Sequence, residues 1–144
     1  SEIFDAVNDY ELLKVINTAN IACGYHAGGK NIIKETIINS KKFDMKIACE
    51  IFADRNYEDD GTLVSRSKDH ALITDPERAK EHVYNMVKNQ TLNCHSGKQI
   101  PCEIDSICIH GDNKSSLLTA IQVKENLLKN NLELKPLNKM SKFV

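Results

Sequence analysis

Residues 46–55 read KIACEIFADR, and this stretch decides the fold class. Its apolar run, interrupted only by Glu50, predicts a buried strand that ends at the Asp54-Arg55 pair. A helix start follows at residues 75–77, where Asp, Pro and Glu combine a capping carboxylate, a first-turn proline and a first-turn acid. Residues 105–110 then predict another buried strand. A strand, a helix and a strand in this order are typical of βα units and a parallel sheet.

The rest of the chain continues this alternation of elements. We predict helices at residues 9–16 and 31–42, from residue 76 onward, and from Ser115 or Ser116 onward. We predict strands at residues 18–23, 46–53 and 105–110, with 132–137 as a last strand, and a β-hairpin at 92–103 broken at 96–98. The expected fold class is therefore α/β.

The apolar spacing of the two later helices predicts which sides they bury. In the helix that begins at residue 76, the predicted buried residues are Ala79, Val83, Met86 and Val87. In the helix that begins near residue 116, they are Leu117, Ala120, Ile121 and Leu128.

Composition excludes several classes of function. The 144 residues are enough for one domain with a core of its own. Nineteen Lys and Arg against 20 Asp and Glu give a net charge of -1, so bulk charge attracts neither nucleic acid nor an anionic membrane. No apolar run approaches the ~20 residues of a membrane-spanning helix, and no signal-peptide pattern opens the chain. We therefore expect a cytoplasmic protein that binds neither nucleic acid nor a membrane.

The five cysteines, at positions 23, 49, 94, 102 and 108, form no Cys-x-x-Cys pair. An odd set without paired spacing argues against a disulfide scaffold and against a structural zinc site. Cys94 and Cys102 flank the predicted hairpin turn, so a disulfide across it is the alternative. We expect reduced thiols, because the other three cysteines favour a reducing compartment.

Polar side chains mark the ends of the three predicted parallel strands. They are His26 after the first strand, Glu50, Asp54 and Arg55 on or after the second, and His110 and Asp112 at the end of the third. In a β/α barrel the carboxyl ends of the strands open on one face, so such residues converge on one pocket. Singly, each is more often a hydrogen-bonding group of a loop than a catalyst. The shared placement is what predicts a site.

Four ordered motifs resemble one known family. Residues 17–28, NTANIACGYHAG, resemble its S-A-N-I-A-C-G-F-H-A-G signature, and residues 50–57, EIFADRNY, resemble its E-V-F-A-D-R-x-Y. Residues 60–67, DGTLVSRS, resemble D-G-x-L-V-x-R, followed by the A-x-I-x-D-P helix start at 71–76. Residues 107–112, ICIHGD, resemble I-C-V-H-G-D. The chain thus resembles the LamB/YcsF family over most of its length.

This resemblance implies a fold and an activity. The fold is a parallel β/α barrel related to that of carbohydrate deacetylases. The activity is the ATP-coupled hydrolysis of the lactam 5-oxo-L-proline to L-glutamate, carried out with two other 5-oxoprolinase subunits. ATP is the expected cosubstrate, with Mg²⁺ as its candidate ion. An unactivated lactam resists water, and phosphorylation of its oxygen would make the ring carbon electrophilic.

The resemblance also suggests roles for the site residues. His26 and His110 are proton-transfer candidates because the reference pKa of histidine, about 6.5, lies near working pH. Asp112 would orient or charge-balance one of them. The predicted substrate- or phosphate-binding residues are Asn20, Gly24, Glu50, Asp54, Arg55 and Arg66, with the two arginines suited to a carboxylate or a phosphate. Arg66, in the long polar loop at 56–74, is expected to reach over the pocket, and no residue is assigned as a metal ligand.

The chain departs from the family pattern in its middle. The A-H-P-x-Y-P-D and K-P-H-G-A-L-Y motifs have no counterpart, and residues 40–46 lead straight into the later strand. A full barrel takes about 250 residues, so residues 1–144 are expected to form a single, incomplete barrel domain. We expect an exposed sheet edge, self-association or partner dependence, and no 5-oxoprolinase activity from this chain alone.

Three other interpretations stay open. The chain could be a non-catalytic remnant that needs a partner, or a metal-dependent deacetylase-like hydrolase using His26, His110 and Asp112. It could also bind nucleotide through Gly24-x-x-x-x-Gly29-Lys30-Asn31, which is close to a P-loop. Asn31 lacks the hydroxyl that a P-loop offers to magnesium, and no paired histidine spacing favours a metal site.

Overall fold

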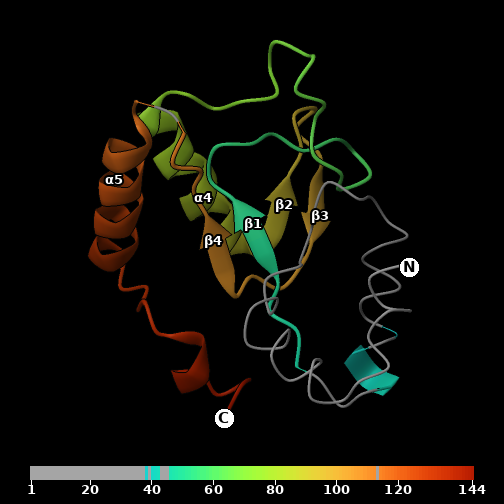
Figure 1. Ribbon diagram of the computed structural model, residues 1–144, viewed down its shortest axis with the longest axis vertical. Coiled ribbons are helices and arrows are strands. Elements are labelled where there is room, and N and C mark those ends of the chain that lie inside the picture. Colours follow the sequence, from blue (N-terminus) through green and yellow to red (C-terminus); the bar gives the residue numbers. More distant parts are fainter. Residues whose placement is uncertain (1–37, 39, 43–45, 113) are drawn as a thin grey trace.

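The computed structural model describes residues 38, 40–42, 46–112 and 114–144. The expectations for Asn20, Gly24 and His26, and for the elements predicted before residue 38, lie outside these residues. The described elements are β1 (Glu50–Phe52), α4 (Pro76–Asn89), β2 (Thr91–Asn93), β3 (Gln99–Pro101), β4 (Ser106–Cys108), α5 (Ser116–Lys129) and the 3-10 helix η1 (Leu137–Lys139). Figure 1 shows β1 and β4 side by side, with α4 and α5 to one side of them and the β2–β3 hairpin to the other.

The strands β1 and β4 form a parallel pair, as the βα alternation predicts. Their register places Glu50 opposite Ser106, Ile51 opposite Ile107, and Phe52 opposite Cys108. The strands β2 and β3 form the predicted antiparallel hairpin, with Leu92 opposite Ile100. The fold of the described residues is thus mixed α/β. They form two separate two-stranded sheets, so the expected barrel does not close within them.

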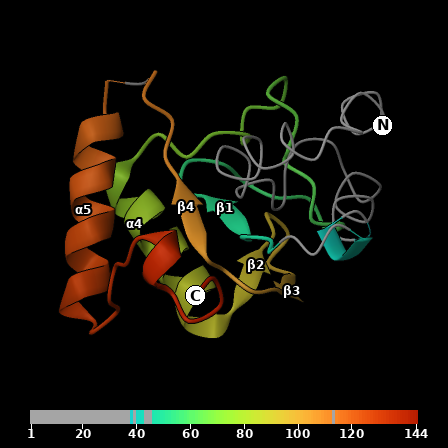
Figure 2. The ribbon, with the colours of Figure 1, turned by 60° about the horizontal axis from the view of Figure 1, so that its bottom comes forward.

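One face of the β1–β4 pair is covered by the two helices, which lie side by side in both ribbon views (Figure 2). Ala53 packs there with Val83 of α4 and with Val123 and Leu127 of α5. Ile107 also packs against this cluster. Because successive side chains of a strand point to opposite faces, Glu50, Phe52 and Asp54 belong to the other face.

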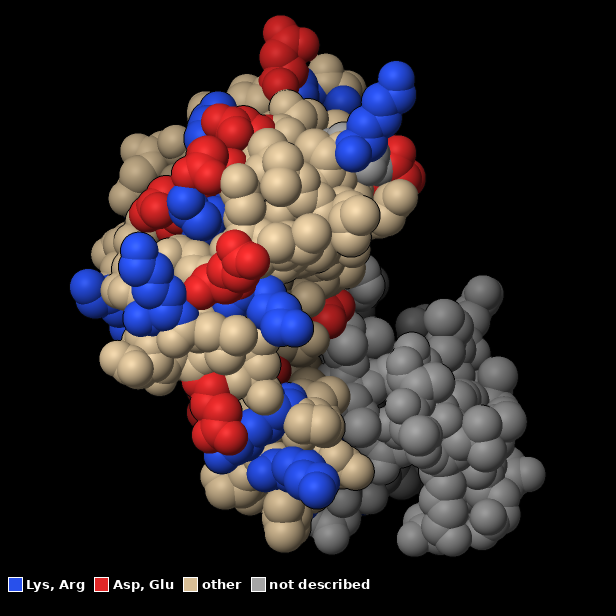
Figure 3. Space-filling model, turned by 90° about the vertical axis from the view of Figure 1, so that its left-hand side faces the viewer, with Lys and Arg blue, Asp and Glu red and all other residues tan. Residues whose placement is uncertain are grey.

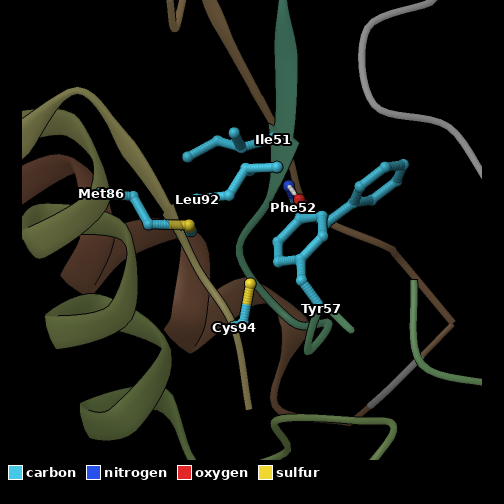
Figure 4. Close-up of a cluster of buried hydrophobic side chains, with 6 residues drawn as sticks. All are labelled: Ile51, Phe52, Tyr57, Met86, Leu92 and Cys94. Carbon is cyan, nitrogen blue, oxygen red and sulfur yellow. Dashed lines mark hydrogen bonds between the residues drawn. The ribbon is translucent and has the colours of Figure 1, made fainter. Parts of the chain in front are cut away.

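A second cluster joins β1 to the hairpin. It consists of Ile51, Phe52, Tyr57, Met86, Leu92 and Cys94. Tyr57 is fully buried in this cluster, and its hydroxyl oxygen accepts a hydrogen bond from the backbone N–H of Phe52 at 2.8 Å (Figure 4). Burial of apolar side chains stabilises by about 25 cal/mol per Å², so this cluster fixes the long loop and the hairpin to β1.

The start of α4 follows its sequence signals. The side chain of Asp75 accepts a hydrogen bond from the backbone N–H of Glu77 at 3.0 Å, and Pro76 occupies the first helical position. Ala79, Val83 and Met86 are buried, as predicted. The predicted hairpin break is confirmed as well, since Gly97 has a φ of 93° that favours glycine.

The predicted buried side of α5 is wrong. Thr119, Val123 and Leu127 are buried, whereas Leu117, Ile121 and Leu128 are 74%, 44% and 49% exposed. Apolar residues lie on several sides of this helix, so their spacing alone left its rotation open. Packing against α4 and β4 selects the stripe that contains Val123.

The strand predicted at residues 132–137 is also absent from the structure. This segment has no regular element before η1, and Leu132 packs against the cluster formed by α4 and α5. A strand needs a partner, and among the described residues β4 pairs with β1 alone. Neither described α-helix has the length and apolar character that crossing a bilayer requires.

Candidate functional site

The carboxyl ends of β1 and β4 bring together Asp54 and His110. The Nδ1 atom of His110 lies 2.9 and 2.8 Å from the two carboxylate oxygens of Asp54. The parallel register explains the contact, because Phe52 is opposite Cys108 and each residue of the pair comes two positions later. The side chains of His110 and Asp54 are 27% and 15% exposed, so both are sheltered while His110 remains reachable from solvent.

This contact leaves the other ring nitrogen of His110 for chemistry. A carboxylate only accepts hydrogen bonds, so Nδ1 carries the proton that Asp54 accepts. In the neutral imidazole, Nε2 is then an acceptor that can take a proton from water or from a substrate group. The sequence suggested Asp112 as the acid that orients or charge-balances one of the two histidines. At His110 the structure gives this position to Asp54, whereas His26 lies outside the described residues. Asp112 is exposed beyond the strand end.

Glu50, at the start of β1, lies on the same face of the β1–β4 pair as Asp54. Its Oε2 accepts a hydrogen bond from the hydroxyl of Ser106 at 2.8 Å, which matches their opposite positions in the strand pair. Cys108 lies between the two acidic residues along this face, and burial, followed by the charges of Glu50 and Asp54, raises the pKa of its thiol. Its thiol therefore stays protonated and is a poor nucleophile.

Sequence reasoning assigned no role to Ser106 or Cys108. The signal for both was the alternation along residues 106–110, which puts Ser106, Cys108 and His110 on one face.

Arg55 is buried, and its guanidinium is engaged by the protein itself. The Nη2 atom donates to the carbonyl oxygen of Val64 at 2.8 Å, and Nε donates to that of Ala71 at 3.3 Å. Burial, followed by the nearby positive charge of Arg66, lowers the pKa of Arg55. Through these two hydrogen bonds, Arg55 stabilises the conformation of the loop at residues 56–74. Binding of a substrate anion by Arg55 stays a prediction.

Arg66 is exposed on that loop. No ion pair of Arg66 is found among the residues that the structure describes. Its charge acts on Arg55, which directly follows Asp54, so Arg66 belongs to the surroundings of the site. Its reach over a pocket stays a prediction.

At the opposite end of the strands, one group of side chains has the ligand types of a metal site. The ligand atoms of Cys49, Glu103 and Asp105 lie within 4.8 Å of one another. The ammonium group of Lys142 lies 2.8 Å from Glu103 and 2.6 Å from Asp105, so a cation of the protein itself balances both carboxylates. Cys49 and Asp105 precede β1 and β4, whereas the catalytic candidates follow them. This group is therefore separate from the site formed by Asp54 and His110.

Four of the five cysteines lie within the described residues. Cys49, Cys94, Cys102 and Cys108 are all free thiols. Burial raises the pKa of Cys102 to about 11. The alternative disulfide between Cys94 and Cys102 is not formed.

Comparison with known proteins gives this site its context. The chain is 42% identical over 106 residues to the A subunit of 5-oxoprolinase from Clostridium beijerinckii, an alignment covering 74% of this chain and 42% of that protein. It is 45% identical over 95 residues to the A subunit of 5-oxoprolinase from Campylobacter jejuni subsp. doylei, covering 66% of this chain and 37% of that protein. The chain therefore spans about two fifths of the length of these relatives.

A solved structure resembles the fold as well. The crystal structure of the lactam utilization protein from Thermus thermophilus superposes with a TM-score of 0.62 at 26% sequence identity. The superposition covers 72% of this chain and 40% of that one. Residues 2–48 and 37–142 match the model of the LamB/YcsF family. Together these matches show that the chain belongs to the LamB/YcsF family.

Proposed function

We propose that this chain carries the proton-transfer pair of the A subunit of a 5-oxoprolinase, in which Asp54 and His110 serve the ATP-dependent hydrolysis of 5-oxo-L-proline to L-glutamate. The observation that carries the proposal is the 2.8 Å contact between Nδ1 of His110 and Asp54. A carboxylate that orients a histidine is the arrangement used to activate water. The relatives supply the substrate class, since two of them are named as the A subunit of 5-oxoprolinase.

The proposed chemistry begins with transfer of a phosphoryl group from ATP to the lactam oxygen. Water then adds to the ring carbon, and its proton passes to Nε2 of His110. The imidazolium that forms is stabilised by Asp54 on the other side of the ring. The C–N bond breaks as the ring nitrogen takes the proton from the imidazolium, and a second water hydrolyses the acyl phosphate to glutamate and phosphate. A positioned general base contributes about 10²–10⁴-fold to such a step.

Arg66 is the described cation best placed for an anionic group of the substrate or of ATP. Its guanidinium is exposed and its charge is felt by Arg55, the neighbour of Asp54, whereas the guanidinium of Arg55 already binds two carbonyl oxygens. Among the described residues, no group of three or more His, Cys, Asp or Glu ligands includes His110, so the proposal names no protein ligand for magnesium.

The proposal includes partners and a longer barrel. The lettered name of the relatives favours work with other subunits, of which the family resemblance implies two. The chain spans about two fifths of such a protein. A complete β/α barrel is expected only with the additional length that the relatives have. A cytoplasmic location fits the four free thiols of the described residues.

The test has two parts. The purified chain is mixed with the other two subunits, ATP and 5-oxoproline, and the release of glutamate and phosphate is measured. We expect no turnover. In the full-length Clostridium beijerinckii relative, replacing the counterpart of His110 with Ala should lower kcat by about 10²–10⁴-fold. Full activity of that variant would overturn the role of His110, and turnover by the short chain would overturn the need for a longer barrel.

A second candidate function is that of a non-catalytic piece that acts by association. The observation in its favour is the apolar exposure of α5, where Leu117 is 74% exposed. A groove of about 430 Å³ between α5 and the C-terminal segment adds apolar surface from Ile107 and Leu134. On the face of the molecule that bears α5, charges of both signs are interspersed with uncharged surface (Figure 3). The His110 variant of the full-length relative separates the two candidates, because a purely associative role of this region would leave kcat unchanged.

A further inference from the structure

We propose that Phe52 is a positioning residue of the site formed by Asp54 and His110, where it sets the plane of the His110 imidazole. This inference rests on the proposed function, in which His110 is the base. The rings of Phe52 and His110 are stacked, with centroids 5.4 Å apart and planes inclined by 13°. Phe52 is only 3% exposed, so its ring is a fixed wall for the imidazole.

The contact with Asp54 alone does not determine the direction in which Nε2 points. Rotation about the terminal torsion of a histidine side chain is broad, and a contact to Nδ1 allows the ring to tilt about the hydrogen bond. A stacked aromatic ring removes this freedom, because tilting would break the face contact. Asp54 thus selects which nitrogen carries the proton, and Phe52 selects the orientation of the ring.

Tyr57 in turn holds Phe52 in place. The backbone N–H of Ala53 donates to the carbonyl oxygen of Cys108 at 2.9 Å, on the side of β4. Successive N–H groups of a strand point to opposite edges, so the N–H of Phe52 points away from β4. There it donates to the hydroxyl oxygen of Tyr57 at 2.8 Å.

The Tyr57 hydroxyl is suited to this task because it stays neutral. Burial raises the pKa of Tyr57 well above its ordinary value, so no charge develops beside the strand. A fully buried tyrosine therefore takes the place of a neighbouring strand at this edge, directly before the site. Tyr57 holds Phe52 and Phe52 holds His110, so the three residues form one continuous support for the imidazole.

The first test uses the chain itself and nuclear magnetic resonance of the His110 ring. In the unmodified chain, the two C–H protons of His110 should be displaced upfield by the Phe52 ring current. Long-range ¹H–¹⁵N spectra should show the proton on Nδ1. In Phe52→Leu the ring-current displacement should disappear while the proton stays on Nδ1, because Asp54 is unchanged.

The matched control is Met86→Leu, which alters the same buried cluster without touching His110. It should leave the His110 signals in place. The proposal is overturned if Phe52→Leu leaves these signals unmoved, or if Met86→Leu moves them equally. Should Phe52→Leu fail to fold, Tyr57→Phe removes only the hydroxyl. The Tyr57→Phe variant should then show a weaker ring-current displacement of the His110 protons. An unchanged His110 spectrum would contradict the proposal that Tyr57 holds Phe52 in place.

The second test measures catalysis in the full-length Clostridium beijerinckii relative with its partner subunits. Replacing the counterpart of Phe52 with Leu should lower kcat by about 10–100-fold and leave KM nearly unchanged, because a misaligned base affects the chemical step and not substrate binding. A rise in KM with unchanged kcat contradicts the positioning role. If the counterpart of His110 proves dispensable, the proposed function fails, whereas the spectroscopic result on the Phe52 stack still stands.

Discussion

The guanidinium of Arg55 lies 2.8 Å from the carbonyl oxygen of Val64, nine residues further along the chain. The same side chain donates to the carbonyl oxygen of Ala71. One buried arginine is therefore bonded to two separate parts of the loop at residues 56–74. Hydrogen bonds from a charged donor contribute about 1.5–3 kcal/mol each, and the carbonyl groups left behind in Arg55→Ala would be unpaired. The loop that carries Arg66 is therefore ordered by the residue that directly follows Asp54.

Replacing Arg55 with Ala should destabilise the chain by roughly 2–4 kcal/mol. Urea unfolding gives this free energy, and hydrogen exchange should show faster opening of residues 56–74. Arg66→Ala is the control, because an exposed arginine without a described ion pair should change stability by less than about 0.5 kcal/mol. Equal effects of the two replacements would show that Arg55 does not order the loop.

The half-buried His82 predicts a pH dependence of stability. Burial first, and then the charge of Arg78, lower the pKa of His82 to about 4, although a hydrogen bond to the backbone of Arg55 opposes the shift. Because the folded pKa lies below the unfolded value of 6.5, the unfolded chain binds more protons between these values. The contribution of neutral His82 to the free energy of unfolding is complete above pH 6.5. It is lost as the pH falls toward 4, by about 3 kcal/mol in total.

This pH dependence can be assigned by substitution. His82→Phe keeps a ring beside Tyr57, with which His82 is stacked, but removes the titrating group. The slope of unfolding free energy against pH should flatten between pH 4 and 6.5. His95→Phe, at an exposed position, is the control and should keep the slope. A steep slope that survives His82→Phe would assign the effect to other groups.

Lys142 should stabilise the end of the strands opposite to the site. Burial opposes its charge, but hydrogen bonds to Asp105 and Glu103 outweigh it and raise the pKa of Lys142. Since Lys142 is 35% exposed, solvent screens the pair, and Lys142→Ala should cost about 1 kcal/mol. Lys135→Ala, at the more exposed pair with Glu133, should cost less. Unfolding in high salt should reduce the difference between the two variants, and an unchanged difference would rule out an electrostatic origin.

The exposed side of α5 should drive self-association. Leu117 and Ile121 are 74% and 44% exposed, and large contiguous apolar patches are rare on monomers. Replacing both with Lys should shift the chain toward monomer in sedimentation velocity, with little change in stability. Leu127→Lys is the contrasting variant, since Leu127 is 2% exposed and its replacement should prevent folding. Association that persists in the double variant would place the contact elsewhere.

Several features were predictable from the sequence because their causes are local. These features are the Asp75-Pro76 helix start, the break of the hairpin at residues 96–98, and the presence of strands around Ile51 and Ile107. The strand around Ile107 is only half-buried, although its apolar run predicted a buried strand. The family was predictable for a related reason, since four motifs keep their order along the chain. The placement of polar residues at strand ends also foresaw that Asp54 and His110 would meet.

Tertiary structure decided what depends on register and rotation. Asp54, and not Asp112, reaches His110 because the parallel register puts both residues two positions beyond the pair of Phe52 and Cys108. The rotation of α5 was set by packing, since its apolar residues lie on several sides and spacing could not choose among them. The stack of Phe52 on His110 joins two different strands that are far apart in the sequence, and no local propensity specifies such a contact.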